Sequence, residues 1–396
     1  MPISNLFVER EVCELPGVKF IQAKLGMPAR IVDDMAPVFD MLSGAADPVQ
    51  KAKEIIVLRK NKGAFVKECP GTRNYTCCGY KILHIGTYCT MDCSYCILQS
   101  YFHPPMLQLF MNHDELYNEL EALFSQDVIT RIGTGEFTDS LIWETWTDLT
   151  QTLVHKFSRQ SRAVLELKTK TVSIHGLRAL DHYRKTIVSW SLNTETVMRS
   201  EERHTAPLSA RLAAAKKCES WGYPLAFHFD PIVLYDGCEM DYQKVIRKLF
   251  SEVSAENIVW ISLGTFRYMP ALKKIIQTRF PASRIAYGEF IPGLDGKMRY
   301  FKPLRIAVYQ KMISWIRQAA PEVLIYFCME DDEVWQTTMG FLPAERGGLP
   351  KMLDESAVKH CGLKPAGRDE SRKHEIRLNP LKTNTETLHA FPLKKK

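Results

Sequence analysis

The fold of this chain is decided by the stretch Lys81-Ile-Leu-His-Ile-Gly-Thr-Tyr-Cys-Thr-Met-Asp-Cys-Ser-Tyr-Cys-Ile-Leu-Gln99. Its apolar beginning, 81–86, predicts a buried strand, and Cys89, Cys93 and Cys96 follow in a loop at Cys-x3-Cys-x2-Cys spacing. A [4Fe-4S] cluster normally takes four thiolates. A compact loop that offers three therefore predicts an iron–sulfur site with one iron left open for a substrate or cofactor.

A structural zinc site is the main alternative use of these cysteines. Zinc takes four ligands, so the loop would have to recruit Cys69, Cys77, Cys78 or a histidine. A disulfide framework is disfavoured, because eleven cysteines are an odd number and the stretch Met1-Pro-Ile-Ser-Asn-Leu6 lacks the regions of a secretion signal. We therefore expect a cytoplasmic protein.

Length and composition predict one main globular domain with smaller attachments. The chain has 396 residues, of which 45% are hydrophobic and 24% charged, enough to bury a large core. No apolar run is long enough to predict a membrane span. The net charge of +7 permits nucleic-acid binding without requiring it.

Strand and helix patterns alternate along the middle of the chain. Strands are expected at 81–86, 128–133, 163–169, 186–192, 224–229 and 258–263, with helices near 113–125, 144–158, 208–221 and 241–253. Such alternation predicts parallel pairing, with right-handed crossovers, in an open or incomplete barrel. The expected regions are an N-terminal α/β cap and connector (1–80), the barrel (81–265), a hairpin and helix region (266–330), and an extension ending in a flexible tail (331–396).

Polar side chains follow the ends of these expected strands. Because the carboxyl ends of parallel strands meet at one face of a barrel, we expect them to share one mouth. They are Cys89, Glu136, Asp139, Lys170, Ser191, Asn193, His228, Asp230 and Cys238. Each also has a purely structural interpretation, such as capping a helix or satisfying a turn.

The cysteine motif resembles that of radical S-adenosylmethionine (SAM) enzymes, in which an aromatic residue, here Tyr95, precedes the last cysteine. Four further segments make the chain similar to the spore photoproduct lyase family from about residue 5 to 328. These are Ser191-Leu-Asn193, Arg211-x2-Ala-Ala215, Gly222-Tyr-Pro-Leu225 and Pro231-Ile232. The resemblance implies a partial (β/α)6 TIM-type barrel, a [4Fe-4S] cluster, and SAM cleaved to a 5′-deoxyadenosyl radical that abstracts hydrogen from the substrate.

The resemblance also implies partners and residue roles. In the lyases the radical repairs a thymine photoproduct in DNA, so a carbon–carbon lyase of this type, with DNA as its partner, is the leading expectation. A flavodoxin or ferredoxin would supply the electron. The implied cluster ligands are Cys89, Cys93 and Cys96, and the implied SAM contacts are Tyr95, Gly135, Glu136, Asp139, Lys170, Ser191 and Asn193.

The chain departs from the lyase pattern at two positions. The lyases carry a hydrogen-donor cysteine where Phe137 stands here, and a relay tyrosine where Ile97 stands. SAM cleavage should survive both changes, but the return of hydrogen to a repaired base is put in doubt. A family member that acts on another nucleobase or a small molecule is therefore an alternative, and a non-catalytic iron–sulfur nucleic-acid-binding protein is another.

Two features near 230 suggest further chemistry. Alternation along Phe227-His-Phe-Asp230 sends His228 and Asp230 to one face, which we expect to be the barrel interior. There they would act as an acid/base pair or form a buried pair without chemistry. Cys238, past the same strand, is our hypothesis for the replacement hydrogen donor.

The stretch 285–301 predicts a hairpin, because Gly293-Leu-Asp-Gly296 supplies turn residues between two runs that contain aromatic residues. In the lyases a corresponding hairpin wedges into the duplex beside the lesion. The resemblance then implies that Lys297, Arg299, Tyr300 and Lys302 contact nucleic acid. A plain hairpin that covers the barrel end is the alternative.

Overall fold

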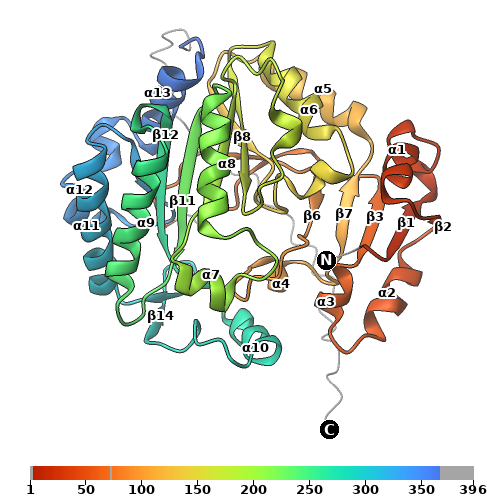
Figure 1. Cartoon of the computed structure of the whole chain (residues 1–396), viewed down its shortest axis with the longest axis horizontal. Coiled ribbons are helices and arrows are strands. Elements are labelled where there is room, and N and C mark those ends of the chain that lie inside the picture. The colour runs from red at the N-terminus through yellow and green to blue at the C-terminus, as the bar shows by residue number, and fades with distance from the viewer. Residues whose placement is uncertain (1–2, 72–73, 366–396) are drawn as a thin grey trace.

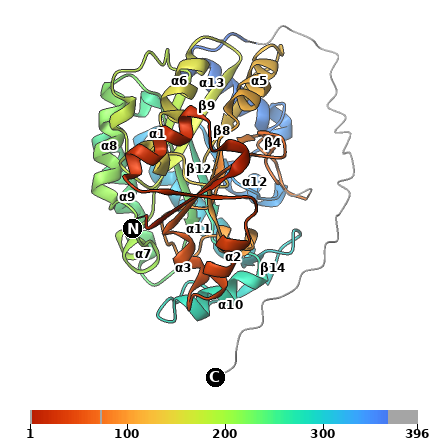
Figure 2. The same cartoon turned by 90° about the vertical axis from the view of Figure 1, so that its right-hand side faces the viewer.

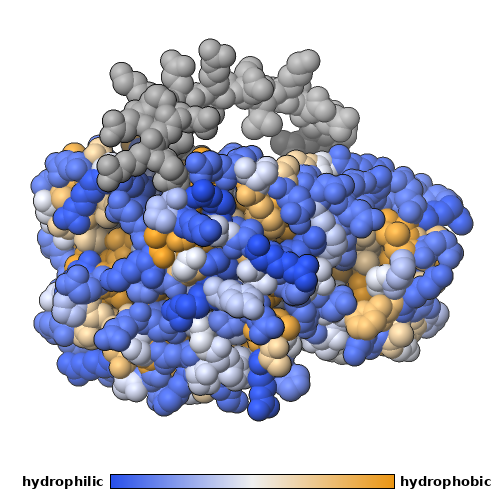
Figure 3. Space-filling model, turned by 90° about the horizontal axis from the view of Figure 1, so that it is seen from above, coloured by the Kyte–Doolittle hydropathy of each residue, from blue (hydrophilic) through white to orange (hydrophobic). Residues whose placement is uncertain are grey.

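A computed structural model describes residues 3–71 and 74–365 of the chain (Figure 1). Most of the expected flexible tail lies outside these residues. None of the helices within the described part has both the length and the apolar character needed to cross a membrane. The face seen in Figure 3 is mostly hydrophilic, with scattered apolar side chains.

The largest sheet has the strand order β16-β12-β11-β10-β9-β8-β5-β4. The strands are β4 Val66–Glu68, β5 Lys81–Leu83, β8 Thr130–Gly133, β9 Ala163–Thr169, β10 Thr186–Ser191, β11 Leu225–Ile232, β12 Ile258–Thr265 and β16 Ile325–Phe327. Every neighbouring pair is parallel except β4 with β5. The sheet curls into a partial barrel, which confirms the expected fold class, with β16 as a seventh parallel strand.

Helices cover the outside of this sheet because each has one apolar stripe. In α5, for example, the buried residues Leu116, Leu120 and Leu123 recur at helical spacing. The helices between and after the barrel strands are α5 His113–Phe124, α6 Leu149–Ser158, α7 Glu195–Glu201, α8 Leu208–Ser220, α9 Cys238–Glu252, α11 Lys302–Ala319, α12 Asp332–Met339 and α13 Leu349–Cys361.

The N-terminal cap is built on a second sheet of order β2-β1-β3-β7-β6. Its elements are β1 Asn5–Glu9, α1 Pro16–Leu25, β2 Ala29–Val32, α2 Ala36–Ser43, α3 Pro48–Ala52, β3 Ile55–Arg59, β6 Gly86–Thr87 and β7 Leu107–Phe110. Strands β6 and β7 come from beyond residue 80, so the cap sheet is wider than the sequence predicts. Figures 1 and 2 show the cap at one end of the molecule, against the side of the barrel that carries β8.

The C-terminal region contains the expected hairpin. Strands β14 Phe290–Pro292 and β15 Met298–Tyr300 pair antiparallel, and β13 Arg267–Tyr268 joins β15 on its other side. Two short helices complete this end of the barrel, α4 Leu98–Tyr101 and α10 Pro270–Arg279. Figure 1 shows α4, α7 and α10 together along the lower edge, where the carboxyl ends of the barrel strands meet.

Candidate active site at the barrel mouth

The cysteine loop, residues 88–97, lies between β6 and α4 at this end of the barrel. It begins at Tyr88, which has a φ of 71° and whose backbone N–H donates to Phe137 O over 2.8 Å. Cys93 is buried, and Cys89 and Cys96 are half-buried. The loop is therefore joined at its start to the segment that leaves β8.

Lys53, from the end of α3 in the cap, holds the first half of the loop. Its ammonium donates to Cys89 O over 3.1 Å and to Met91 O, and it lies 3.5 Å from a carboxylate oxygen of Asp92. The side chain is only 4% exposed. A buried cation is stable only when it is paired and hydrogen-bonded. The contacts with the loop therefore explain how Lys53 can be buried with its charge.

Arg279, at the end of α10, holds the second half of the loop. Its guanidinium bonds Asp47 at 3.0 Å and Asp92 at 3.1 Å, and it donates to the side-chain oxygen of Gln99. The amide of Gln99 in turn donates to Cys93 O over 3.0 Å. One side chain thus joins the cap, the loop and the C-terminal region.

The end of α7 supports the loop from a third side. The hydroxyl of Ser94 donates to Glu201, and the hydroxyl of Tyr95 donates to Glu202. Glu202 also pairs with the buried Arg211. Burial tends to raise the pKa of Glu202, but Arg211 and nearby Lys170 outweigh it and hold this pKa below the ordinary value. Tyr95 is therefore anchored to protein atoms through its hydroxyl.

The three thiols fit the ligand set of an iron–sulfur cluster. Burial raises the pKa of Cys89 to about 12, so its thiolate needs compensating positive charge, which bound iron would supply. The backbone N–H of Met91 already donates to Cys89 Sγ over 3.4 Å. Within residues 3–71 and 74–365, no three His, Cys, Asp or Glu side chains converge on one metal ion. An iron–sulfur cluster does not require its thiolates to converge on one ion, because each thiolate binds a different iron.

Lys170 is the implied SAM contact that the structure leaves available. Its ammonium lies 5.9 Å from the ring centre of Tyr95 and within electrostatic range of Cys93. Among the described residues this ammonium forms no ion pair. This half-buried cation has Glu202 and Asp139 within electrostatic range but not in contact, so its position beside the cysteine loop suits the carboxylate of a ligand.

The side chains of Asp139 and Asn193, two of the implied SAM contacts, are hydrogen-bonded within the protein. Asp139 accepts bonds from Leu141 N at 3.0 Å, from the hydroxyl of Thr169 at 2.8 Å and from Lys170 N at 2.9 Å. Asn193 is 1% exposed. Its amide donates to Pro231 O over 2.8 Å and accepts from Thr194 N and from the hydroxyl of Tyr242, both at 2.9 Å. With their polar atoms satisfied, both residues tie strand ends together.

Of the other implied SAM contacts, Glu136 and Ser191 are bonded within the protein and Gly135 is closely packed. Glu136 is bound by the ammonium of Lys168. Gly135 is required by packing, since a Cβ there would lie 2.8 Å from Lys168 Cβ and 3.1 Å from Ser140 Oγ. Ser191 is buried, and its carbonyl accepts from Arg211 over 2.7 Å.

His228 and Asp230 do face the barrel interior, but they are not a pair. The ring of His228 bonds Glu166 and Ser262, each at 2.7 Å. Burial would raise the pKa of Glu166, yet the charge and hydrogen bond of His228 lower it to about 2. Asp230 instead forms a two-armed ion pair with Arg267, at 3.1 and 3.0 Å. The structure therefore assigns His228 to the buried interior and Asp230 to the mouth.

Cys238, the hypothesised hydrogen donor, shares none of the charged neighbours that surround the thiol of Cys328. It is the first residue of α9, and the groups that act on its thiol are Tyr235, Glu239 and Asp241. The thiol that meets the mouth is Cys328, whose sulfur lies 3.3 Å from Arg267 Nη2.

The hairpin residues expected to contact nucleic acid are bound within the protein. Arg299 is 1% exposed and pairs with Asp295 at 2.8 Å, while Tyr300 is 6% exposed and its hydroxyl accepts from Leu234 N. Lys297 lies 3.5 Å from the Asp295 carboxylate. The burial of Arg299 and Tyr300 removes them as direct contacts with phosphate or base.

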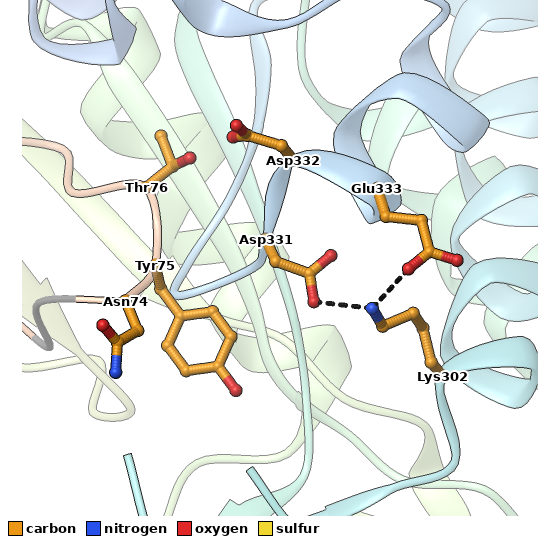
Figure 4. A pocket seen from close by; sticks show the side chains of 7 residues that line it. All are labelled: Asn74, Tyr75, Thr76, Lys302, Asp331, Asp332 and Glu333. Carbon is orange, nitrogen blue, oxygen red and sulfur yellow. Dashed lines mark hydrogen bonds and ion pairs between the residues drawn. The ribbon is translucent and has the colours of Figure 1, made fainter. Parts of the chain in front are cut away.

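Lys302 lines an acidic pocket of about 580 Å³. Figure 4 shows its ammonium between the carboxylates of Asp331 and Glu333, at 2.9 and 2.6 Å. The remaining lining residues are Asn74, Tyr75, Thr76 and Asp332. Three carboxylates and one ammonium line the pocket, and the ammonium pairs with two of them, so the pocket is negative and does not attract phosphate.

The comparisons with known proteins agree with this architecture. The family model described as spore photoproduct lyase matches residues 53–301. The chain belongs to the spore photoproduct lyase family. The spore photoproduct lyase of Bacillus subtilis is 24% identical over 209 residues, which are 52% of this chain and 61% of that relative. The lyase of Clostridium acetobutylicum is 21% identical over 255 residues, 64% of this chain and 72% of the relative.

Two of the relatives match over part of their length only. The matched region spans 61% of the Bacillus subtilis lyase and 62% of the Geobacillus lyase, less than two thirds of each. A solved mutant of spore photoproduct lyase with dinucleoside spore photoproduct has a TM-score of 0.72 at 21% identity, covering 83% of this chain and all of the other. A solved double mutant with bound AdoMet and the same dinucleoside has a TM-score of 0.72 at 20% identity, with the same coverage. The likeness confirms the partial barrel.

Sequence reasoning missed Lys53 and Arg279, which hold the cysteine loop. It also missed Lys168 and Arg267, the basic partners of acids that it placed at the mouth. Lys53 and Arg279 carried no local signal. A signal did exist in β9, where Glu166 and Lys168 alternate with apolar residues and so share a face with Lys170.

Proposed function

We propose that this protein is a radical SAM enzyme that uses the mouth of its barrel to abstract hydrogen from a bound substrate. One observation carries the proposal. A loop with three thiols is held by buried ion pairs from the cap, from α7 and from α10. Beside it lies the ammonium of Lys170, which forms no ion pair among the described residues. Buried ion pairs that fix the shape of a loop indicate a binding site whose geometry is set before the ligand binds.

The residues around the loop have separate proposed roles. A [4Fe-4S] cluster on Cys89, Cys93 and Cys96 would supply the electron that splits SAM into methionine and a 5′-deoxyadenosyl radical. Lys170 would pair with the carboxylate of SAM. Lys53 binds backbone carbonyls of the loop and Arg279 binds the carboxylate of Asp92 within it, so both side chains fix the shape of the loop.

The first substrate to test is a thymine photoproduct in DNA. The matching relatives are named spore photoproduct lyases, and the solved structures bind dinucleoside spore photoproduct. We propose DNA as the partner and a flavodoxin or ferredoxin as the electron donor.

A second candidate is a different nucleobase or a small polar molecule. Two observations favour it. The basic groups of the hairpin are matched by acids of this chain, and the barrel mouth is lined by the ion pairs Asp230–Arg267 and Glu136–Lys168. Charged groups in the mouth suit a substrate that carries hydrogen-bonding or charged groups of its own.

Anaerobic reconstitution tests both candidates. The protein should take up iron and sulfide and, with a reductant, convert SAM to 5′-deoxyadenosine. Conversion of dinucleoside spore photoproduct to thymidines would support the repair function. SAM cleavage that leaves the photoproduct intact would favour the second candidate, and a loaded protein that cannot cleave SAM would contradict both.

A further inference from the structure

Cys328 lies inside the barrel mouth. It directly follows β16, and its backbone N–H continues the pairing with β12 by donating to Leu263 O over 3.1 Å. Ile325 and Phe327 are buried, while Tyr326 and Cys328 alternate with them. Tyr326 lies within electrostatic range of Glu166, an interior residue, so Cys328 faces the same interior.

The surroundings of the Cys328 thiol come from several strand ends. Arg267 Nη2 lies 3.3 Å from its sulfur, and Asp230, Glu136 and Lys168 lie within electrostatic range. These groups follow or end β12, β11, β8 and β9. The thiol therefore stands where the mouth converges, next to ion pairs that are partly exposed.

Phe137 cannot donate a hydrogen atom from the position where the lyases have their cysteine. Its ring centre lies 5.0 Å from that of His84, 6.3 Å from that of Tyr101 and 6.0 Å from that of Phe102. This aromatic group fills the position. The groups near the Cys238 thiol are Tyr235, Glu239 and Asp241, none of which is among the charged groups around Cys328.

We propose that Cys328 is the hydrogen-atom donor that quenches the substrate radical in this enzyme. The inference rests on the proposed function. In the transfer the S–H bond breaks homolytically and a C–H bond forms on the substrate, so the carbon radical is reduced by one hydrogen atom and a thiyl radical remains on Cys328. No charge moves, and no further reagent is needed for this step.

The local electrostatics keep the thiol protonated. Burial raises the pKa of Cys328, and the lowering effect of Arg267 does not cancel it. A thiol that holds its hydrogen at neutral pH can give it up as an atom, whereas a thiolate cannot.

Two further thiols lie in the same part of the structure. Cys69 and Cys78, in the connector between β4 and β5, lie within electrostatic range of Cys328. The connector meets the segment after β16, since Thr76 N donates to Glu330 O over 3.1 Å. Figure 4 shows this closeness, with Asn74, Tyr75 and Thr76 opposite 331–333.

The test compares Cys328→Ala with Cys238→Ala, both reconstituted with cluster and supplied with SAM and dinucleoside spore photoproduct. In D2O, where thiols exchange, wild-type and Cys238→Ala should place deuterium in the repaired thymidine. Cys328→Ala should still form 5′-deoxyadenosine within about twofold of wild type but lose at least about tenfold in correct product, with radical-derived side products in its place.

A second readout does not depend on turnover. In wild-type protein, binding of the dinucleoside should slow the alkylation of Cys328 by iodoacetamide, followed by mass spectrometry, and should leave Cys238 unaffected. If Cys328→Ala matches wild type in product and deuterium content, the inference is overturned and the proposed function stands. If wild-type protein cleaves SAM but neither binds nor converts the photoproduct, the proposed substrate falls and this inference falls with it.

Discussion

The cysteine loop and the hairpin region, residues 290–302, both lie beyond the ends of the barrel strands, but their charged residues have different roles. Around the loop, the charges of Lys53 and Arg279 are paired with loop carbonyls and carboxylates, and Lys170 forms no ion pair within the described residues. In the hairpin region, Arg299 and Lys302 are matched by carboxylates. The first arrangement prepares a site for a ligand, and the second closes a surface.

This difference limits what the family resemblance transfers. The loop has its three thiols and is held by Lys53 and Arg279, so we propose that the chemistry of the family applies to it. The hairpin keeps its shape, yet the segment 330–333 supplies acids to it: Glu330 pairs with Arg305, and Asp331 and Glu333 pair with Lys302. Four experiments test this comparison.

The largest effect is expected from Cys93→Ala. Loss of one of three thiolates should abolish cluster assembly and lower SAM cleavage at least about a hundredfold, because the remaining two cannot hold a cluster open at one iron. Iron and sulfide content and 5′-deoxyadenosine formation measure the effect. Cys13→Ala, in the cap, is the control. A variant with normal iron, sulfide and cleavage would contradict the ligand assignment.

Arg279→Met tests the support of the loop. It leaves Asp92 buried without its guanidinium partner, and breaking a buried ion pair costs about 3 to 5 kcal/mol. We expect a lower unfolding midpoint and low cluster content, with partial rescue by Arg279→Lys. Arg284→Gln, an exposed position nearby, should change neither. Normal cluster content in Arg279→Met would mean that the loop holds its shape unaided.

Lys170→Met tests whether the ammonium of Lys170 binds the carboxylate of SAM. Loss of a charged hydrogen bond costs about 1.5 to 3 kcal/mol, so the Kd for SAM should rise about ten- to a hundredfold while cluster content stays normal. The matched control is Lys168→Met, two residues away on the same strand face but already paired with Glu136. Equilibrium binding of SAM to reconstituted protein measures both. Equal weakening by the two variants would remove the special role of Lys170.

The smallest effect is expected at the hairpin. If Lys302 is neutralised by its neighbours, Lys302→Ala should leave DNA affinity and its salt dependence unchanged within about twofold. Glu333→Gln should raise the affinity slightly, since it releases part of the positive charge. A large loss of affinity in Lys302→Ala, with a salt slope lower by about one, would show that this lysine contacts phosphate and that the two regions are alike.

The sequence predicted the features that depend on neighbouring residues. The spacing of Cys89, Cys93 and Cys96, the alternation of strands and helices, and the turn between β14 and β15 are all local patterns, and the structure has the barrel and the hairpin where they were expected. The burial of Arg299, Tyr300 and Asn193 was beyond its reach, because burial depends on what packs from elsewhere.

Local spacing was enough to specify a loop with three thiols on a barrel of alternating strands and helices, since these patterns repeat over a few residues. The partners of that loop were settled by folding. Arg279 meets Asp47 across 232 positions of the chain, and Arg267 meets Cys328 across 61. Contacts of this kind arise when the sheet curls and brings distant strand ends to one mouth, and no pattern along the chain encodes that distance.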